Sequence, residues 1–381
     1  MSPLRILADA NMQDVEALLA PYGEVRCIDG RALQPRELAD ADVLLVRSVT
    51  RVDADLLAAS PVRFVGTATS GLEHIDQDYL QARGTVFAHA RGANANAVVE
   101  YVLAVIAVCD NYLERLLAGG RLGIVGQGHV GRRLAACARE LGIAAQACDP
   151  WLDDVVSAAD IEEVLTCDVI SLHPELTTRD PWPSFHLLDA EQLARIPGDS
   201  LLVNASRGPV IDNAALRAHL AMGAGPTTVL DVWEGEPNPD PALLGLVHLG
   251  SPHIAGYTED ARYGATHILA RALARWLGAE PPAATAALAP APVLSLGPAS
   301  DALAQLRAVL LGRYDPRHDD AGLRAAMDAV APAAAARAFD RLRREYPPRR
   351  ELRGSRVVAP GLPPAWSRAL GLENPEEGSH D

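Results

Sequence analysis

The sequence contains no lysine: all 34 basic residues are arginine, against 49 acidic residues. Without a lysine the protein cannot form a Schiff base with a carbonyl compound, and it cannot carry the lysine of a P-loop. Any anionic ligand must be held by arginine, by backbone amides or by hydroxyl groups. The net charge of −15 opposes binding to a phosphate backbone, so we expect no nucleic-acid partner.

Long apolar segments and paired cysteines are also missing. The best apolar run, residues 97–109, contains Glu100 and is shorter than the roughly 20 residues that cross a bilayer. The N-terminus lacks the basic and apolar regions of a secretory leader, so we expect no membrane association. Five cysteines without a C-x-x-C pair fit a reducing compartment and offer no structural zinc site. The sequence therefore predicts a cytoplasmic protein without a metal.

The residues that are present indicate an α/β protein with two or three domains. The chain of 381 residues exceeds one typical domain, and short β-branched runs alternate with longer helical patterns. Several runs are apolar without interruption, as expected for parallel strands covered by helices on both faces. The expected strands are residues 4–8, 43–46, 63–66, 122–125, 143–147, 169–172, 201–204, 228–232 and 247–249.

Breaks in this pattern divide the chain. A helix expected over residues 97–117 ends before Gly119 and Gly120, and a new strand follows. After a helix at 259–276, the alanine- and proline-rich residues 281–292 are typical of a semi-rigid linker. The remaining residues, 293–381, are expected to form a small α/β appendage with an acidic tail at 374–381.

A glycine-rich turn lies between the expected strand at 122–125 and an amphipathic helix. Such a G-x-G-x-x-G turn provides a tight bend, room for a pyrophosphate and close contact between helix and strand. The helix N-terminus adds backbone amides and a partial positive charge. The expected cofactor-binding residues of this turn are Gly126, Gln127, Gly128, His129, Val130 and Gly131.

An acidic residue in the second half of the same unit supports a dinucleotide. The strand at 143–147 leads to Asp149, 18 residues after Gly131. A carboxylate at this place can accept both ribose hydroxyls of NAD, and it would repel the additional phosphate of NADP. The cofactor is therefore expected to be NAD.

Three later segments place polar residues where strands should end, which is where open α/β sheets bind their ligands. Residues 203–212 contain Arg207, residues 229–237 contain Asp231 and Glu236, and residues 251–257 contain His253. Together with the glycine motif, they resemble the D-isomer-specific 2-hydroxy acid dehydrogenase family over residues 4–277. The resemblance implies a Rossmann-type, doubly wound NAD domain and a second, flavodoxin-like α/β domain that binds the substrate.

The resemblance also implies domain boundaries and further site residues. The substrate domain would be discontinuous (1–97 with 257–280), followed by the NAD domain (98–256), the linker (281–292) and a C-terminal domain (293–381). Near the nicotinamide, the positions that match the family are Pro174, Ala205, Ser206, Asp231 and Gly256. Pro174 stands where the family commonly has histidine-x-proline, so we expect only backbone or van der Waals contact there.

The chemistry of alcohol oxidation gives roles to three of these residues. Hydride transfer leaves a proton on oxygen, and His253 is the candidate base because imidazole titrates near neutral pH. Glu236 is expected to orient the imidazole and to stabilise its charged form. Arg207 is expected to bind the substrate carboxylate and to polarise the developing carbonyl.

Closer matches fall outside this shared core, at residues 46–50, 64–71, 98–101, 256–258, 314–320 and 339–346. They resemble the members of the family that oxidise 4-phospho-D-erythronate during pyridoxal 5′-phosphate synthesis. This resemblance implies a phosphorylated sugar acid as substrate, with Ser48, Thr69 and Tyr257 as binding residues. Arg47, next to Ser48, could add charge for the phosphate or be a solvated arginine beside a strand end. It also implies a homodimer formed through the C-terminal domain.

Two alternatives stay open from the sequence. The protein could be another dehydrogenase of this family, acting on 3-phosphoglycerate, glyoxylate or hydroxypyruvate. It could also be a non-catalytic, NAD-sensing corepressor on the same scaffold. Assays with a panel of substrates test the first alternative. Turnover that disappears on substitution of His253 would exclude the second.

Overall fold

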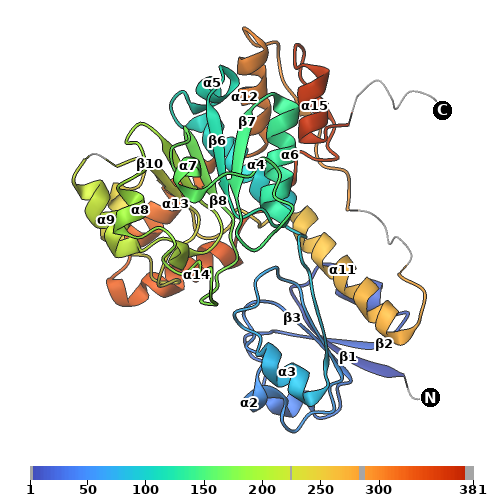
Figure 1. Ribbon diagram of the computed structural model, residues 1–381. Helices are drawn as coiled ribbons and strands as arrows, with labels where there is room; N and C mark the ends of the chain where they lie inside the picture. Colours follow the sequence, from blue (N-terminus) through green and yellow to red (C-terminus); the bar gives the residue numbers. More distant parts are fainter. Residues whose placement is uncertain (1–2, 224, 283–287, 374–381) are drawn as a thin grey trace, which may run out of the picture. The chain divides into compact units, whose positions relative to one another are not determined.

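The computed structural model describes residues 3–223, 225–282 and 288–373, which form two compact units (Figure 1). The first unit contains Met1–Asn94 and Thr258–Pro290, and the second contains Ala95–Tyr257 and Ala291–Asp381. This grouping places the C-terminal segment, which the sequence predicts to be a separate domain, together with the second unit. Residues 283–287 of the predicted linker and the predicted acidic tail at 374–381 lie outside the described residues.

The first unit is built on a parallel sheet with the strand order β2-β1-β3-β4-β5. This is the flavodoxin-like order, as expected from the sequence. Its strands are β1 (Leu4–Asp9), β2 (Gly23–Ile28), β3 (Val43–Val46), β4 (Phe64–Thr67) and β5 (Val86–His89). Its helices are α1 (Val15–Leu19), η1 (Pro35–Leu38), α2 (Ala54–Leu57), α3 (Gln77–Arg83) and α11 (Glu259–Leu277).

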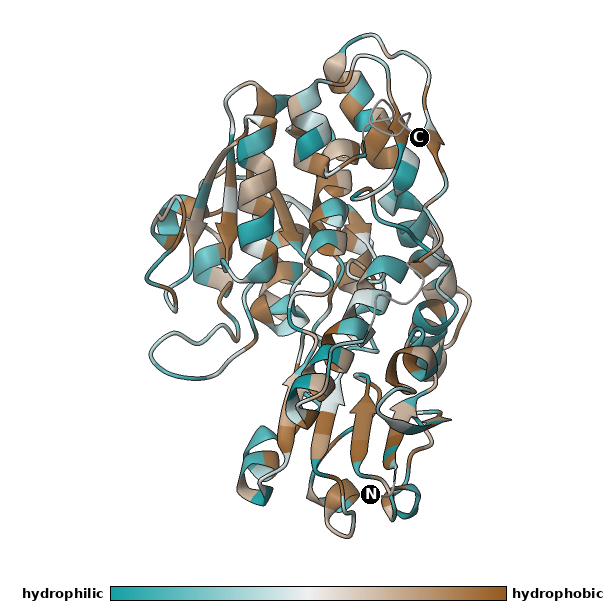
Figure 2. Ribbon diagram, turned by 90° about the vertical axis from the view of Figure 1, so that its right-hand side faces the viewer, coloured by the Kyte–Doolittle hydropathy of each residue, from teal (hydrophilic) through white to brown (hydrophobic). Residues whose placement is uncertain are grey.

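Alternating strand residues of this sheet feed two apolar clusters, because successive side chains of a strand point to opposite faces. On one face Ile6 and Val43 pack with Leu18 of α1 and with Leu269 and Leu273 of α11. On the other face, strand residues pack with leucines of η1, α2 and α3. The strands are accordingly coloured mainly as hydrophobic in Figure 2.

The second unit contains a six-stranded parallel sheet with the order β11-β10-β9-β8-β6-β7. Its strands are β6 (Arg121–Val125), β7 (Ala144–Cys148), β8 (Val169–Leu172), β9 (Leu201–Asn204), β10 (Thr227–Leu230) and β11 (Leu249–Gly250). The order reverses between β6 and β8, which confirms the predicted doubly wound, Rossmann-type domain. Because all strands are parallel, their carboxyl ends lie along one edge of the sheet.

Helices cover both faces of this second sheet. They are α4 (Ala95–Val108), α5 (Tyr112–Leu117), α6 (His129–Leu141), α7 (Ile161–Val164), α8 (Ala190–Leu193), η2 (Gly208–Val210), α9 (Asn213–Ala221) and α10 (Pro241–Leu246). Ile124 of β6 belongs to the apolar cluster with α4 and α6, whereas its neighbour Val125 belongs to the cluster on the opposite face. The sheet is therefore buried on both sides, as its uninterrupted apolar strands predict.

The C-terminal segment extends these two clusters. It contains β12 (Leu294–Ser295), α12 (Ala302–Arg313), α13 (Pro316–Asp328), η3 (Pro332–Ala334), α14 (Ala335–Arg344), β13 (Val357–Val358) and α15 (Pro364–Leu370). β12 and β13 pair in parallel, so the segment is a small α/β element, as expected. Leu306 and Leu370 join the cluster around α4 and α6, and Leu323 and Phe339 join the other.

Two further findings concern the described residues. No helix among them is both long enough and apolar enough to cross a membrane. The five cysteines are all free thiols, and three of them (Cys109, Cys137 and Cys167) are buried.

Candidate active site

The glycine turn after β6 has a separate physical reason for each glycine. Gly126 has φ +86°, and a Cβ there would lie 2.5 Å from the backbone nitrogen of Pro174. A Cβ on Gly131 would collide with the carbonyl oxygen of Gly126. Gly128 differs, since a Cβ on it would have nothing within 4 Å. The protein itself does not fill the space at Gly128, which fits the approach of a pyrophosphate to the backbone.

The other residues of this turn divide between the helix end and the interior. His129 is exposed and, with Val130, begins α6, whose first amides have no partner inside the helix. The side chain of Gln127 is fully buried and forms hydrogen bonds with the backbone of Val156, at 2.8 Å from Nε2 to the carbonyl and 2.6 Å from the amide to Oε1. Gln127 thus ties the turn to the loop after β7.

Asp149 lies directly after β7 and faces the glycine turn. Its carboxylate accepts hydrogen bonds from the amide of Gln127 at 2.8 Å and from the amide of Trp151 at 3.1 Å. A carboxylate oxygen can accept more than one hydrogen bond, so both oxygens can also receive a ribose hydroxyl. The turn, the helix end and this acid together fit NAD.

β8 is followed by a half-buried histidine, His173, and by Pro174. The Nε2 atom of His173 lies 2.9 Å from the hydroxyl of Ser171, and burial lowers the pKa of His173 to about 3. This imidazole is therefore neutral at physiological pH. Pro174 borders the glycine turn through its backbone at Gly126.

The loop after β9 is organised by Asn204. Its side-chain oxygen accepts hydrogen bonds from the amide and hydroxyl of Ser206, and its Nδ2 donates to the carbonyl of Arg207 at 3.0 Å. Ala205 and Arg207 are half-buried, and Nη1 of Arg207 donates to the carbonyl of Ser206 at 2.8 Å. The backbone of Arg207 is thus fixed at the carboxyl end of β9.

Asp231, directly after β10, is fully buried. One oxygen accepts from the Ser251 hydroxyl at 2.7 Å and from the Ile254 amide at 2.8 Å, and the other accepts from the Ala255 amide at 2.9 Å. Ser251 is in turn 2.8 Å from the hydroxyl of Tyr101. Asp231 therefore holds the segment after β11 from its amide side.

His253 and Glu236 form a direct pair. Nδ1 of His253 lies 2.7 Å from Oε2 of Glu236, whose other oxygen accepts from the Trp233 amide at 2.8 Å. Burial opposes ionisation of Glu236, but the interactions with His253 and Trp233 outweigh it, so the pKa of Glu236 is below its usual value. The bond at Nδ1 fixes the ring and leaves Nε2 as the nitrogen that can exchange a proton with a substrate.

The three candidate catalytic residues follow neighbouring strands. Arg207 follows β9, Glu236 follows β10 and His253 follows β11, and these strands are adjacent in the sheet. The structure joins Glu236 to His253 by a hydrogen bond and places Arg207 at the next strand end. Gly256 lies three residues beyond His253 and is half-buried.

The candidate substrate residues belong to both units. In the second unit the ring of Tyr257 meets that of Tyr346 edge-on, with the ring centroids 5.9 Å apart. In the first unit Ser48 is exposed after β3, and Thr69 after β4 forms hydrogen bonds with Thr67 and Gly71, each at 2.8 Å. Ser48 and Thr69 therefore follow adjacent strands of the first sheet.

Arg47, the candidate for additional charge, has an acidic neighbour in the same unit. Its Nε lies 3.1 Å from a carboxylate oxygen of the buried Asp9. Part of the charge of Arg47 is therefore balanced inside the first unit.

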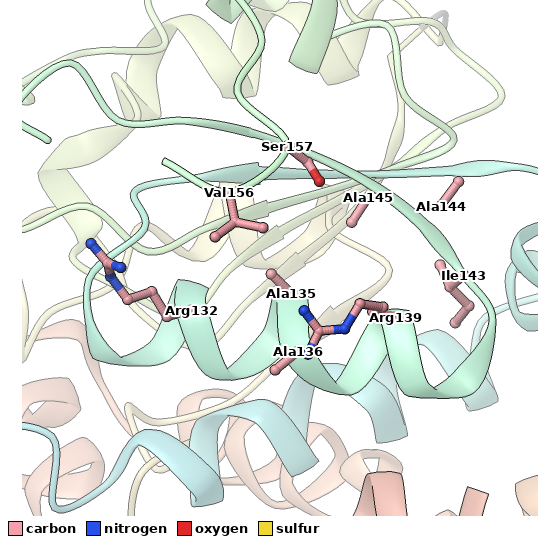
Figure 3. A pocket seen from close by; sticks show the side chains of 9 residues that line it. All are labelled: Arg132, Ala135, Ala136, Arg139, Ile143, Ala144, Ala145, Val156 and Ser157. Carbon is pink, nitrogen blue, oxygen red and sulfur yellow. The ribbon is translucent and has the colours of Figure 1, made fainter. Parts of the chain in front are cut away.

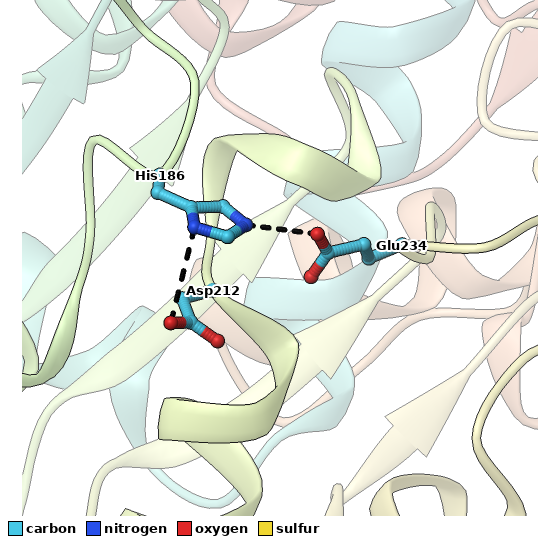
Figure 4. Close-up of side chains that lie close together, drawn as sticks. All are labelled: His186, Asp212 and Glu234. Carbon is cyan, nitrogen blue, oxygen red and sulfur yellow. Dashed lines mark hydrogen bonds and ion pairs between the residues drawn. The ribbon is translucent and has the colours of Figure 1, made fainter.

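The structure shows a further cluster that the sequence reading missed (Figure 4). Nε2 of His186 lies 2.8 Å from Glu234, and Nδ1 lies 3.8 Å from Asp212. The residue types and spacing could suit a metal ion. However, the imidazole itself stands between the two carboxylates, and each carboxylate also accepts backbone amides, Asp212 at the start of α9 and Glu234 from Asn213. Only proximity in the fold shows this cluster, because its members are far apart in the sequence.

A surface hollow of about 460 Å³ lies between α6 and β7 (Figure 3). Arg132 and Arg139 of α6 line it together with alanines of α6 and β7 and with Val156 and Ser157. None of the candidate catalytic residues lines this hollow.

Comparisons with known proteins place this geometry in a family. Residues 96–255 match the NAD-binding domain of the D-isomer specific 2-hydroxyacid dehydrogenases, and residues 289–370 match a domain family of unknown function. The erythronate-4-phosphate dehydrogenase of Azotobacter vinelandii is 44% identical over 97% of this chain and all of its own length. That of Marinobacter nauticus is 42% identical over 93% of this chain and 95% of its own.

Solved structures agree on the fold. The D-lactate dehydrogenase of Aquifex aeolicus with NAD and lactic acid has a TM-score of 0.61 at 20% identity, covering 72% of this chain and 95% of its own. The NAD⁺-bound 3-phosphoglycerate dehydrogenase of Entamoeba histolytica has a TM-score of 0.62 at 22% identity, covering 72% and 96%.

The matched NAD-binding domain spans the glycine turn and Asp149, so the cofactor is NAD. The similarity to the enzymes from Azotobacter and Marinobacter extends over nearly the whole chain, including the C-terminal segment. The chain belongs to the erythronate-4-phosphate dehydrogenase family, within the D-isomer specific 2-hydroxyacid dehydrogenases.

Proposed function

We propose that the protein uses NAD to oxidise 4-phospho-D-erythronate to (R)-3-hydroxy-2-oxo-4-phosphooxybutanoate, a step toward pyridoxal 5′-phosphate. The observation that carries the proposal is the His253–Glu236 pair, 2.7 Å apart at neighbouring strand ends. The chain that carries this pair matches two relatives over nearly their full length, and both relatives are named erythronate-4-phosphate dehydrogenase.

The reaction removes a hydride from C2 of the substrate and a proton from its hydroxyl group. When bound, NAD supplies the acceptor for the hydride. In our proposal, Nε2 of His253 takes the hydroxyl proton, and the Glu236 carboxylate at Nδ1 stabilises the resulting imidazolium. Arg207 binds the C1 carboxylate and polarises the oxygen that becomes the carbonyl, because a guanidinium can donate two parallel hydrogen bonds.

The remaining candidates bind the two ligands. In our proposal, the turn at residues 126–131 holds the pyrophosphate, Asp149 the ribose, and Pro174, Ala205, Ser206, Asp231 and Gly256 border the nicotinamide. The hydroxyls of Ser48, Thr69 and Tyr257 hold the hydroxyl and phosphate groups of the substrate. Their positions after strands of the two sheets support these roles.

We also infer a homodimer formed through residues 293–381 and a cytoplasmic location. Two exposed valines at the small sheet, Val293 and Val358, support a contact surface in this segment. The free cysteines support a reducing compartment.

A substrate panel tests the activity. Purified protein is given NAD and either 4-phospho-D-erythronate, 3-phosphoglycerate, D-glycerate or D-lactate, and NADH formation is followed in single and multiple turnovers. We expect kcat/KM for 4-phospho-D-erythronate to exceed the others by at least about 10²-fold, because polar groups built for one substrate are left unpaired by another. A preference for 3-phosphoglycerate would contradict the proposed substrate. If no NADH formed with any of the acids, the proposal that the protein is an enzyme would be contradicted.

A further inference from the structure

The backbone at His253 adopts a conformation that non-glycine residues rarely take. Its φ is +57°, in the left-handed region. Such a conformation persists only where the surrounding structure holds it. The amide of His253 donates to the carbonyl of Asp231 at 2.7 Å, and the contacts of the next two residues, Ile254 and Ala255, fix the backbone that follows.

These two residues are held from both sides of their backbone. On the amide side, Asp231 accepts the N–H groups of Ile254 and Ala255. On the carbonyl side, Nη2 of Arg349 donates to Ile254 at 3.1 Å and also to Ala255. Asp231 directly follows β10 of the NAD-binding sheet, whereas Arg349 belongs to the C-terminal segment, 94 residues after Ala255.

Arg349 is itself fixed in a closed setting. It is 8% exposed, and its guanidinium lies 4.4 Å from the ring centroid of Tyr314 and 5.9 Å from that of Tyr346. Asp319 accepts hydrogen bonds from the hydroxyls of both tyrosines, at 2.8 and 2.9 Å. The aromatic faces and the nearby acid offset the cost of burying the charge.

The same group also reaches a substrate candidate, since Tyr346 packs edge-on against Tyr257. The C-terminal segment thus contacts residues on both sides of Gly256. A segment that served only to form a dimer contact would have no requirement for a buried arginine bound to residues 254–255.

We propose that Arg349 is a positioning residue that holds the backbone of residues 254–255 so that His253 stays on Glu236. The inference rests on the proposed function, because His253 must be the base for its position to matter. Arg349 touches neither the imidazole nor Glu236, so it acts through the backbone.

A double-mutant cycle tests this role. Arg349→Met keeps the apolar stem and removes the donors, and Arg344→Met is the matched control, because Arg344 is exposed and paired only with Glu345. We expect Arg349→Met to lower kcat about tenfold in the wild-type background and less than about twofold in the His253→Ala background. NAD affinity should change less than kcat, since the glycine turn and Asp149, which are proposed to hold the pyrophosphate and the ribose, follow different strands. Equal losses in both backgrounds, or no loss, would overturn the proposal.

Hydrogen exchange separates this inference from the proposed function. The peptide covering residues 251–257 should exchange faster in Arg349→Met than in wild type or Arg344→Met, whichever acid the enzyme oxidises. If only the proposed function is wrong, the protein will not oxidise 4-phospho-D-erythronate, but residues 251–257 will still exchange faster in Arg349→Met than in wild type. Unchanged exchange would overturn the positioning role.

A conservative variant covers the case in which Arg349→Met does not fold. Arg349→Lys keeps the charge, but a single ammonium group lacks the planar fork of donors. We expect an intermediate loss in kcat of about threefold that disappears without His253. Wild-type kcat together with wild-type exchange in Arg349→Lys would overturn the proposal.

Discussion

His253 and Asp149 lie at opposite ends of the sheet edge, so their variants should affect different measured quantities. His253 follows β11 and Asp149 follows β7, which are the two outermost strands. A defect in proton transfer changes kcat, whereas a lost ribose contact changes cofactor affinity.

We expect His253→Ala to lower kcat by about 10²-fold or more, because the substrate hydroxyl loses its proton acceptor. Steady-state kinetics and an NAD titration measure the effect, and NAD affinity should change little. His248→Ala, at an exposed position just before β11, is the control. An unchanged kcat in His253→Ala would exclude His253 as the catalytic base.

We expect Asp149→Ala to weaken NAD binding by about tenfold and to narrow the preference for NAD over NADP, because the variant loses an acceptor and a repelling charge. Fluorescence titrations with both dinucleotides measure this. Asp153→Ala, on the same loop but outside the glycine turn contacts, is the control. Equal affinities in wild type and Asp149→Ala would exclude the ribose contact.

At this scale the sequence could predict residues that lie in motifs and not those that meet only in space. Glu236 and His253 follow strands that periodicity locates, so their meeting could be expected. Arg349 and His186 have no local pattern, because their partners are 94 and 48 residues away. Gln127 is predicted to bind the cofactor, and the structure adds that its side chain fixes the neighbouring loop.

At the scale of elements, the buried strands could be predicted from the sequence, and so could the edge strands of the second sheet, whereas the two edge strands of the first sheet could not. β3 and β9 are fully buried, and their residues 43–46 and 201–203 are uninterrupted apolar runs. β2 and β5 lie at the two edges of the first sheet and are half-exposed, so their mixed composition resembles that of loops. The predicted helix at 97–117 is two helices, α4 and α5, because the chain turns at Asp110, where φ is +33°.

The helix α4 carries Glu100, whose carboxyl group makes a pH-dependent contribution to the stability of the protein. Glu100 accepts hydrogen bonds from the amides of Leu352 and Arg353, so it joins α4 to the C-terminal segment. Burial, together with the charge of Glu351, raises the pKa of Glu100 to about 8 from its usual 4.5. Between these values the folded state keeps a proton that the unfolded state releases, so stability falls as pH rises from 4.5 to 8.

We therefore expect Glu100→Gln to be more stable than wild type above pH 8, by about 1 kcal/mol or more, and to differ less below pH 4.5. Thermal unfolding across this pH range measures the difference. Glu140→Gln, at an exposed position of α6, should leave the pH dependence unchanged. A parallel pH dependence in wild type and Glu100→Gln would contradict the raised pKa.

At the scale of the whole molecule, the contacts of the C-terminal segment with the rest of the chain could not be predicted from the sequence. The segment is predicted to form the dimer contact, and the structure adds that α12 and α15 pack on α4 and α6 and join their apolar cluster. The helical patterns could be seen, whereas their partners could not, because contacts between distant helices leave no periodic signal.

The inferred homodimer predicts a mass of twice 40.4 kDa. Size-exclusion chromatography with light scattering measures it over a range of protein concentrations. Because the segment also packs on its own NAD-binding sheet, we expect the secondary structure to be retained when the dimer is diluted apart. A constant mass of 40.4 kDa at all concentrations would exclude the dimer.

The free thiols have a practical consequence for such measurements. Burial raises the pKa of Cys109 and of Cys137 to about 12, and that of Cys167 to about 11. Maleimide dyes react with thiolates, so these native thiols remain largely unlabelled at neutral pH. Cys27 and Cys148 are only half-buried, so a fluorophore would be confined to a cysteine introduced on the surface once these two residues are replaced by serine. The lack of lysine removes the usual competing amine, apart from the chain terminus.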